Sequence, residues 1–203
     1  MANRIITIGR QFGSGGRELG RRLAEALGYE YYDKEIIEQI AEKTSLSVEY
    51  VQNVVEHKPH SLFPITIGQS LAYSDNLAYQ EIQAIYNAQV EILKELASKS
   101  SCVIVGRCAD VILEEYHPFR IFVYASMDSR INRCIERSKE GEDLDPKKLA
   151  KYIQNVDKHR AKYYEHYTKR KWADIENFNL CINTTNAVIK DIVPAIAKLF
   201  KDA

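Results

Sequence analysis

Short apolar runs alternate with longer amphipathic stretches along the chain. The apolar runs predict strands at 4–8, 30–32, 102–106, 120–124 and 179–182. Apolar positions three and four residues apart predict helices at 16–27, 34–43, 47–56, about 77–99, 108–115, 128–138, 146–169 and 187–200. Because helix-length segments separate the strands, the pattern favours a parallel sheet with helices on both faces. Ligand-binding groups are then expected at the carboxyl ends of the strands.

Two segments do not fit this core pattern. Residues 56–76 contain two prolines, and residues 137–148 read "RSKEGEDLDPKK". Segments of this length and polarity between regular elements are typical of functional loops. We therefore expect both to be mobile insertions or lids.

Composition and charge exclude several classes of partner. The 203 residues are 45% apolar, enough for one core, and carry 28 basic and 28 acidic side chains. This balance provides no global field for nucleic acid or an anionic membrane. The apolar runs are far shorter than the roughly 20 residues of a membrane span, and no signal peptide precedes them, so we expect a cytoplasmic protein. The four cysteines form no CxxC pair, which argues against a disulfide or metal site.

A glycine-rich stretch, "RQFGSGGRELG", joins the first strand to the first helix. Gly13, Gly15 and Gly16 allow positive φ angles, so the backbone N–H groups of this turn can point inward and bind an anion at the helix N-terminus. The match to the phosphate-binding pattern GxxxxGK[ST] is partial. Arg10 replaces its first glycine, Gly16 its lysine and Arg17 its hydroxyl residue. The alternative is a tight turn that binds no ligand.

Further polar groups follow the predicted strands. In "VIVGRCADVIL", Arg107 directly follows a buried strand, where a guanidinium group can bind two phosphate oxygens, and Asp110 can orient it or read a base. The alternative for Arg107 is a pair with a surface carboxylate. In "YYDKEII", Asp33 is either a helix N-cap or a substrate-binding group.

An arginine stripe follows the fourth strand. Arg130, Arg133 and Arg137 are spaced to share one helical face, and Asp157 and Arg160 are three residues apart on a later helix. These arginines can close over a polyphosphate if the charged segment behind them folds down. The alternative is an ordinary solvated face.

Aromatic and imidazole side chains receive no catalytic role. Tyr163, Tyr164 and Tyr167 are expected to pack against the core or the lid. The five histidines form no HExxH or other compact set. The candidate chemistry therefore rests on glycines, arginines and carboxylates.

In this order the motifs resemble the cytidylate kinase-like family of P-loop nucleoside monophosphate kinase folds. The resemblance covers nearly the whole chain and rests on "ITIGRQFGSGGRELG", "YYDKEII", "VIVGRCADVIL", "RIFVYASMDSRINRCIER", "VDKHRAKYY" and "LCINTT". It implies an α/β, three-layer P-loop NTPase-type fold: a five-stranded parallel sheet in the order 2-3-1-4-5, helices on both faces and a helical lid. We expect a single P-loop kinase-like domain over 1–203, with an acceptor-binding insertion at about 34–100 and a lid at about 137–170.

The resemblance also implies transfer of the ATP γ-phosphoryl group to a monophosphate. Four arginines fall on positions that the family places at the phosphates, namely Arg107, Arg130, Arg133 and Arg160. The chain departs from the family at Gly16, where the enzymes proper have lysine, and at Cys108, where they have aspartate. Arg17 can restore the charge, but it points about 100° further around the helix.

We therefore expect a phosphotransferase that uses ATP and Mg²⁺ and acts on a nucleoside monophosphate or another small acceptor. The alternative is a nucleotide-binding, regulatory module without turnover. The expected catalytic residues are Arg17, Arg133 and Arg160; those for ATP are Gly13, Ser14, Gly15, Gly16, Arg17, Glu18, Arg130 and Arg133; those for the acceptor are Asp33, Arg107, Asp110 and Arg160. Asp33, Asp110 and Ser14 remain open as metal ligands. No nucleic-acid or membrane partner is expected, and the oligomeric state stays open.

Overall fold

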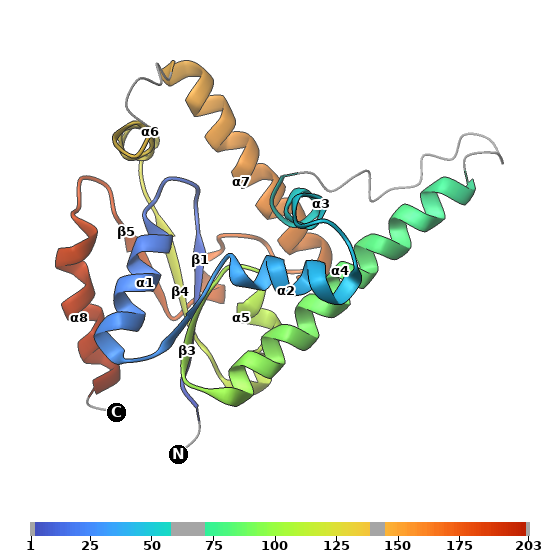
Figure 1. Cartoon of the computed structure of the whole chain (residues 1–203). Helices are drawn as coiled ribbons and strands as arrows, with labels where there is room; N and C mark the ends of the chain where they lie inside the picture. Colours follow the sequence, from blue (N-terminus) through green and yellow to red (C-terminus); the bar gives the residue numbers. More distant parts are fainter. Residues whose placement is uncertain (1–2, 58–71, 139–144, 202–203) are drawn as a thin grey trace.

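A five-stranded parallel sheet forms the centre of the computed structural model, which describes residues 3–57, 72–138 and 145–201 (Figure 1). Its strands are β1 Ile5–Arg10, β2 Glu30–Tyr32, β3 Cys102–Val105, β4 Phe119–Tyr124 and β5 Leu180–Asn183. They lie in the order β2-β3-β1-β4-β5, and every neighbouring pair is parallel. The predicted strand order is confirmed, with β1 at the centre of the sheet.

Helices fill the connections between the strands. They are α1 Gly16–Leu27, α2 Glu35–Thr44, α3 Val48–Gln52, α4 Ala72–Lys99, α5 Ala109–Ile112, α6 Met127–Glu136, α7 Pro146–Thr168 and α8 Ile189–Lys201. The predicted helix at 47–56 is α3 followed by a π-helical turn, Asn53–His57. The predicted helix at 108–115 is the short α5 followed by a 3₁₀ turn, Glu114–Tyr116. Most element predictions are thus confirmed, and two predicted helices are broken into shorter pieces.

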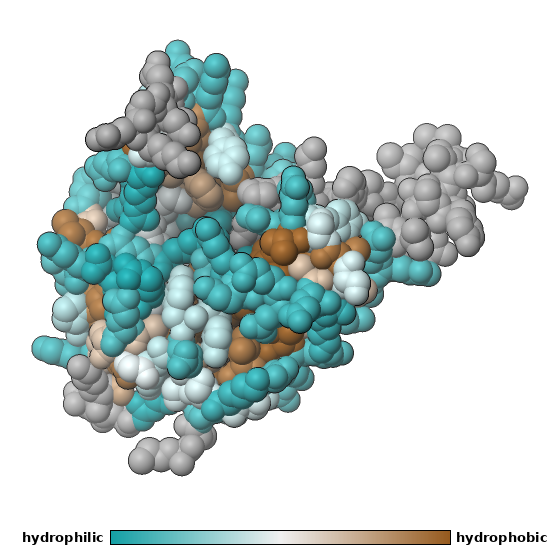
Figure 2. Space-filling view, viewed as in Figure 1, coloured by the Kyte–Doolittle hydropathy of each residue, from teal (hydrophilic) through white to brown (hydrophobic). Residues whose placement is uncertain are grey.

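The two faces of the sheet carry separate cores because alternate residues of a strand point to opposite faces. Ile6 and Ile8 of β1 pack with α1 and α8, while Ile5 packs with α2, α4 and the end of α7. Figure 1 shows α1 and α8 together on one face of the sheet and α2, α4 and α5 on the other. Helices on both faces are therefore confirmed. In the same view hydrophilic residues dominate the outer surface (Figure 2).

The predicted packing of the late tyrosines is confirmed. Tyr163 and Tyr164 are buried in the core beneath α2 and α4. Tyr167 stacks on Tyr86 of α4, with ring centroids 3.8 Å apart. These contacts tie the C-terminal half of α7 to α4 and to the core on that face of the sheet.

The segments expected to be mobile are described only in part. Residues 58–71 and 139–144 lie outside the described ranges. Residues 72–76 form the first turns of α4. Asp145 caps α7 by accepting a hydrogen bond from the Lys147 N–H (2.9 Å), so the described end of the charged segment is regular helix. Within the described ranges, no helix is both long and apolar enough to cross a membrane.

The carboxyl ends of the strands lie at one edge of the sheet, where the β1–α1 loop, α6 and the start of α7 gather (Figure 1). β1 begins and α8 ends at the opposite edge. Polar residues predicted after different strands are thereby collected at one edge, as expected for a parallel sheet.

Candidate active site

The β1–α1 loop has the backbone that an anion nest requires. Gly13 (φ 75°) and Gly15 (φ 83°) both adopt the left-handed conformation, which costs glycine little. The Ser14 N–H and hydroxyl both donate to the Gln11 carbonyl, at 3.3 and 2.8 Å, which closes the turn. The first N–H groups of α1 have no acceptor within their helix, and its positive end faces the loop. The conformation of the loop thus suits an anion, and binding of one stays a prediction.

Asp157 of α7 anchors the start of this loop. Its Oδ1 accepts a hydrogen bond from the Phe12 N–H (2.8 Å), and its Oδ2 pairs with the Arg130 guanidinium. Arg130 Nε also donates to the Phe12 carbonyl (2.6 Å). Burial raises the pKa of the Asp157 carboxyl, and the Phe12 hydrogen bond and the Arg130 charge oppose that rise. Because Arg130 is buried, the interpretation of Arg130 as part of a solvated face is wrong.

Arg133 holds the other side of the loop. It donates to the Gly13 carbonyl (2.9 Å) and to the Thr184 carbonyl after β5 (3.2 Å), and the Thr184 hydroxyl donates to the Ser14 carbonyl (2.7 Å). The third arginine of the stripe, Arg137, pairs with the Glu18 carboxylate. Arg130 and Arg133 therefore contact the glycine-rich loop, and Arg137 contacts the first turn of α1. Binding of ATP phosphates by Arg130 and Arg133, and of ATP by Glu18, stays a prediction.

Arg10, at the end of β1, is the centre of a cluster of charged side chains. Its Nη2 lies 3.8 Å from Oδ1 of Asp33, and Arg17 Nε lies 2.7 Å from Oδ2 of the same carboxylate. Burial, followed by repulsion from Arg160, lowers the pKa of Arg10 to about 9, while Asp33 opposes that fall and Arg107 adds to it. Asp157 Oδ1 also lies 3.7 Å from Arg160, so the cluster holds four guanidinium groups and two carboxylates, and positive charge remains in excess. Such a concave positive site attracts anions.

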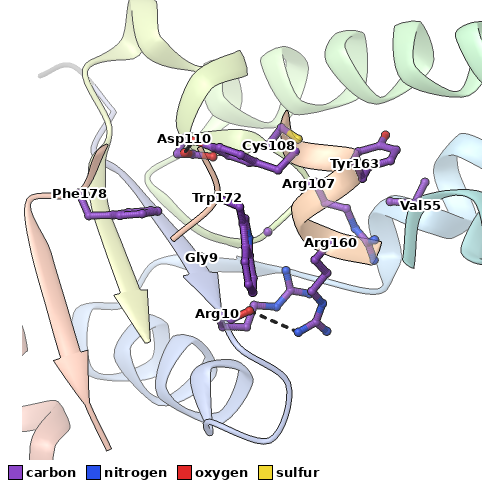
Figure 3. A pocket seen from close by; sticks show the side chains of 12 residues that line it. Gly9, Arg10, Val55, Arg107, Cys108, Asp110, Arg160, Tyr163, Trp172 and Phe178 are labelled. Atoms are coloured by element: carbon purple, nitrogen blue, oxygen red, sulfur yellow. Dashed lines mark hydrogen bonds between the residues drawn. The ribbon is translucent and has the colours of Figure 1, made fainter. Parts of the chain in front are cut away.

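Two of these arginines converge on Arg10 from different elements. Figure 3 shows the side chains of Arg107, after β3, and Arg160, from α7, directed toward the same region as Arg10. Arg160 Nη1 donates to the Arg10 carbonyl (3.3 Å), and its guanidinium lies 5.6 Å from the centre of the Phe12 ring. The predicted residues Arg107 and Arg160 are therefore brought together, next to Arg10, to which the sequence patterns gave no role in the site.

Strained backbone positions Arg107. Gly106, Arg107 and Cys108 have φ angles of 76°, 61° and 53°. A left-handed conformation costs a non-glycine residue on the order of 1–2 kcal/mol. Gln89 Nε2 stabilises the turn by donating to the buried Arg107 carbonyl (2.9 Å). The turn ends where α5 begins, at Ala109.

Beside the arginines lies a small cavity with aromatic walls. It encloses about 50 Å³ and is lined by Arg10, Arg107, Arg160, Asp110, Tyr164 and Trp172, among others (Figure 3). Ligand pockets usually measure roughly 300–1,000 Å³, so a ligand of nucleotide size requires its walls to separate. Tyr164 donates a hydrogen bond to Asp110 (2.7 Å), and burial raises the pKa of both side chains.

The side chains left open as metal ligands are engaged with other protein groups. Asp33 is bound to Arg10 and Arg17 and does not cap α2, whose cap residue is Lys34. The hydroxyl of Ser14 donates to a backbone carbonyl. Across residues 3–57, 72–138 and 145–201, no group of three or more His, Cys, Asp or Glu side chains is placed to hold a metal ion. These side chains do not fit a protein-held Mg²⁺, an ion that commonly binds through substrate phosphates.

Three contributors to this site were not predicted from the sequence. Arg10 was noted at the edge of the glycine-rich loop, where it replaces a glycine of the pattern, but it was given no role in the site, and Phe12 carried no signal. Asp157 was noticed beside Arg160, but its main partner is Arg130, which lies 27 residues away. The available signal was charge: an acidic residue on the helix that follows an arginine stripe is a candidate partner for that stripe.

Comparisons with known proteins match most of the chain. The model of the cytidylate kinase-like family matches residues 5–186. Curated cytidylate kinases of Saccharolobus islandicus are 26% identical over 196 residues, covering 95% of this chain and 88% of theirs. An uncharacterised protein from Eubacterium ventriosum has a similar structure, with a TM-score of 0.70, 25% identity and coverage of 99% of this chain and 100% of that one. Shikimate kinase from Bacteroides thetaiotaomicron shares the fold, with a TM-score of 0.57, 15% identity and coverage of 98% of each chain.

Proposed function

The chain belongs to the cytidylate kinase-like family, and on that premise we propose that it transfers the γ-phosphoryl group of ATP to a nucleoside monophosphate. Family membership supports a phosphotransferase of the nucleotide kinase kind. The name of the Saccharolobus relatives makes cytidylate the first acceptor to test. In the reaction, an acceptor phosphate oxygen forms a bond to the γ-phosphorus. The bond from that phosphorus to the bridging oxygen breaks, and ADP leaves with the electron pair.

The observation that carries this proposal is the position of the arginine cluster next to the glycine-rich loop. Backbone donors at residues 13–17 offer a site for the ATP phosphates, and Arg10, Arg107 and Arg160 line the cavity beside it. Phosphoryl transfer needs little covalent work from the protein and depends on positioning and on stabilisation of negative charge. Two phosphate groups brought to one point repel each other, and the excess positive charge found here would offset that repulsion.

The residues divide between two substrates. Gly13, Ser14, Gly15 and Gly16 receive ATP, with Arg133 supporting the loop through the Gly13 carbonyl. On the acceptor side, Arg107 and Arg160 bind the monophosphate, Asp110 lines the same pocket, and Asp33 acts beside it through its contacts with Arg10 and Arg17. The aromatic walls beside them offer faces for a base. Mg²⁺ would accompany ATP and neutralise phosphate charge.

The proposal is tested by measuring ADP release from ATP, with Mg²⁺ present, against cytidylate, uridylate, adenylate, guanylate and non-nucleotide acceptors. We expect turnover that depends on a monophosphate. Arg107→Met should lower kcat/KM for that acceptor roughly 10- to 100-fold, because a hydrogen bond to a charged group contributes about 1.5–3 kcal/mol. The matched control is Arg120→Met on β4, since Arg120 pairs with the exposed Glu114.

Two outcomes would contradict the proposal. A wild-type rate at background level with every acceptor, while ATP still binds, would leave a nucleotide-binding module without turnover. Equal effects of Arg107→Met and Arg120→Met would mean that the cluster beside the loop does not bind the acceptor.

A further inference from the structure

Position 16, where the phosphate-binding pattern places lysine, has no room for a side chain. A Cβ atom added to Gly16 would lie 2.6 Å from Cβ and 3.2 Å from Cγ of Arg10, and 3.4 Å from Cβ of Val123. The first two atoms belong to the base of the Arg10 side chain and cannot swing away as a flexible tip can. Neither alanine nor lysine therefore fits at position 16 while Arg10 keeps its place.

A second glycine accommodates the other end of Arg10. A Cβ atom on Gly106 would lie 1.7 Å from Nη1 and 2.8 Å from Cζ of Arg10. The Arg10 side chain thus crosses Gly16 at its base and Gly106 at its guanidinium group. Both glycines are needed by this one arginine, which is only 9% exposed and ends 3.8 Å from the Asp33 carboxylate.

We infer that Arg10 is the phosphate-binding cation of this site and replaces the lysine that position 16 lacks. The inference rests on the proposed function and names a further residue for it. In the usual pattern, the lysine extends from the start of the helix to the β- and γ-phosphates. Here the cation comes from position 10, at the other end of the same loop. A guanidinium group offers several N–H donors in one plane, and with a pKa of about 9 that of Arg10 is charged at neutral pH.

The geometry favours Arg10 over Arg17, the other cation of the loop. The Arg17 side chain is 40% exposed and bonds the Asp33 carboxylate from the outer side (2.7 Å). Arg10 lies in the interior of the cluster, where Arg107 and Arg160 both act on its charge. Phosphate oxygens entering the cluster would replace repulsion among these arginines by attraction.

Binding of pyrophosphate and ATP, measured by calorimetry, tests this inference without requiring turnover. Arg10→Met should weaken pyrophosphate binding at least 10-fold, and Arg10→Lys, which keeps the charge, should lose less. The matched control is Arg21→Met, which removes an exposed arginine of α1 that pairs only with the exposed Glu25 among the described contacts. It should change the affinity less than twofold. Thermal melting of each ligand-free variant checks that the protein is folded.

Substitutions at Gly16 test directly whether Arg10 takes the place of a lysine at position 16. Alanine for glycine near a helix start normally stabilises a protein, but the clash with Arg10 predicts that Gly16→Ala lowers both the melting temperature and the pyrophosphate affinity. Gly16→Lys alone should lower both the melting temperature and the pyrophosphate affinity for the same reason. The double variant Arg10→Gly with Gly16→Lys removes the clash and supplies a lysine, so it should bind pyrophosphate at least 10-fold better than either single variant.

These measurements distinguish a failure of the Arg10 inference from a failure of the kinase proposal. Arg10-dependent pyrophosphate binding without turnover by the wild type would support the inference and remove the kinase proposal. Unchanged binding by Arg10→Met, with loss of binding by Arg17→Met, would overturn the inference and make Arg17 the cation of the loop. Absence of pyrophosphate binding by the wild type would overturn it as well.

Discussion

Asp157 should be one of the most sensitive positions of the molecule. Its two carboxylate oxygens bind the Phe12 N–H and the Arg130 guanidinium, so one residue of α7 connects the glycine-rich loop to α6. Asp157→Ala would leave both groups without this acceptor. The side chains are 12% exposed for Asp157 and 6% for Arg130, so water can replace the lost contacts only in part.

The expected loss follows from the burial of the pair. Removing one partner of a buried ion pair costs about 3–5 kcal/mol, because the remaining charge stays buried without compensation. Asp157→Asn should cost about 1 kcal/mol less than the alanine variant, because an amide oxygen can still accept the Phe12 hydrogen bond. Arg130→Met combined with Asp157→Leu should cost less than the sum of the two single changes, because no buried charge is left unpaired.

Urea unfolding at neutral pH measures these differences. The control is Glu114→Ala, which breaks pairs with Arg120 and Arg170 in which the Glu114 side chain is 52% exposed. Exposed pairs of this kind contribute about 0–1 kcal/mol. Two results would show that the Asp157 carboxylate is not the anchor that its contacts indicate. One is a loss of unfolding free energy for Asp157→Ala no larger than for Glu114→Ala, and the other is additive losses for Arg130→Met and Asp157→Leu.

Two further predictions concern stability. Burial raises the pKa of Asp110, so the folded chain holds this proton more tightly than the unfolded chain and loses stability as the pH rises from the unfolded pKa to the folded pKa. Asp110→Asn can still accept the Tyr164 hydrogen bond, so its stability should equal that of the wild type in acid and exceed it at pH 7. Between the two pKa values the difference in unfolding free energy should grow by at most about 1.4 kcal/mol per pH unit. Parallel pH curves of the two proteins in urea unfolding would contradict this. Gly13→Ala should destabilise more than Gly28→Ala, by on the order of 1–3 kcal/mol, because both positions are left-handed but only the Cβ at Gly13 meets backbone, 2.9 Å from the Arg130 carbonyl oxygen. Equal melting temperatures of the two alanine variants would show that the loop can shift to accept a side chain.

The sequence predicted the fold well where both ends of an element carry a signal. The bounds predicted for α1, 16–27, are those observed, because a glycine-rich turn precedes it and the left-handed Gly28 ends it. The prediction failed at 108–115, because α5 begins at Ala109 but already ends at Ile112, and the 3₁₀ turn Glu114–Tyr116 that follows leaves no trace in an apolar pattern. At 47–56 the apolar spacing continues through the π-helical turn, so a change in helix type was not visible either.

The candidate site was predictable in its residue types and not in its contacts. Glycines at 13 and 15 indicated the loop conformation, because positive φ angles are a local property of the chain. The target of Arg133 is a carbonyl 120 residues away. A helical stripe shows which side chains share a face, but the packing of α6 against the loop decides whether that face meets protein, ligand or water.

Arg10 and Gly16 show why a comparison made one position at a time can mislead. In a linear motif they count as two independent losses, a glycine and a lysine, whereas in space they are one exchange, because the base of one side chain occupies the volume of the other. Restoring the lysine alone would create a clash, and restoring the glycine alone would remove a cation. Chains of this family should therefore have either arginine at position 10 with glycine at 16, or glycine at 10 with lysine at 16. An alignment of the family in which mixed pairs are common would refute this coupling.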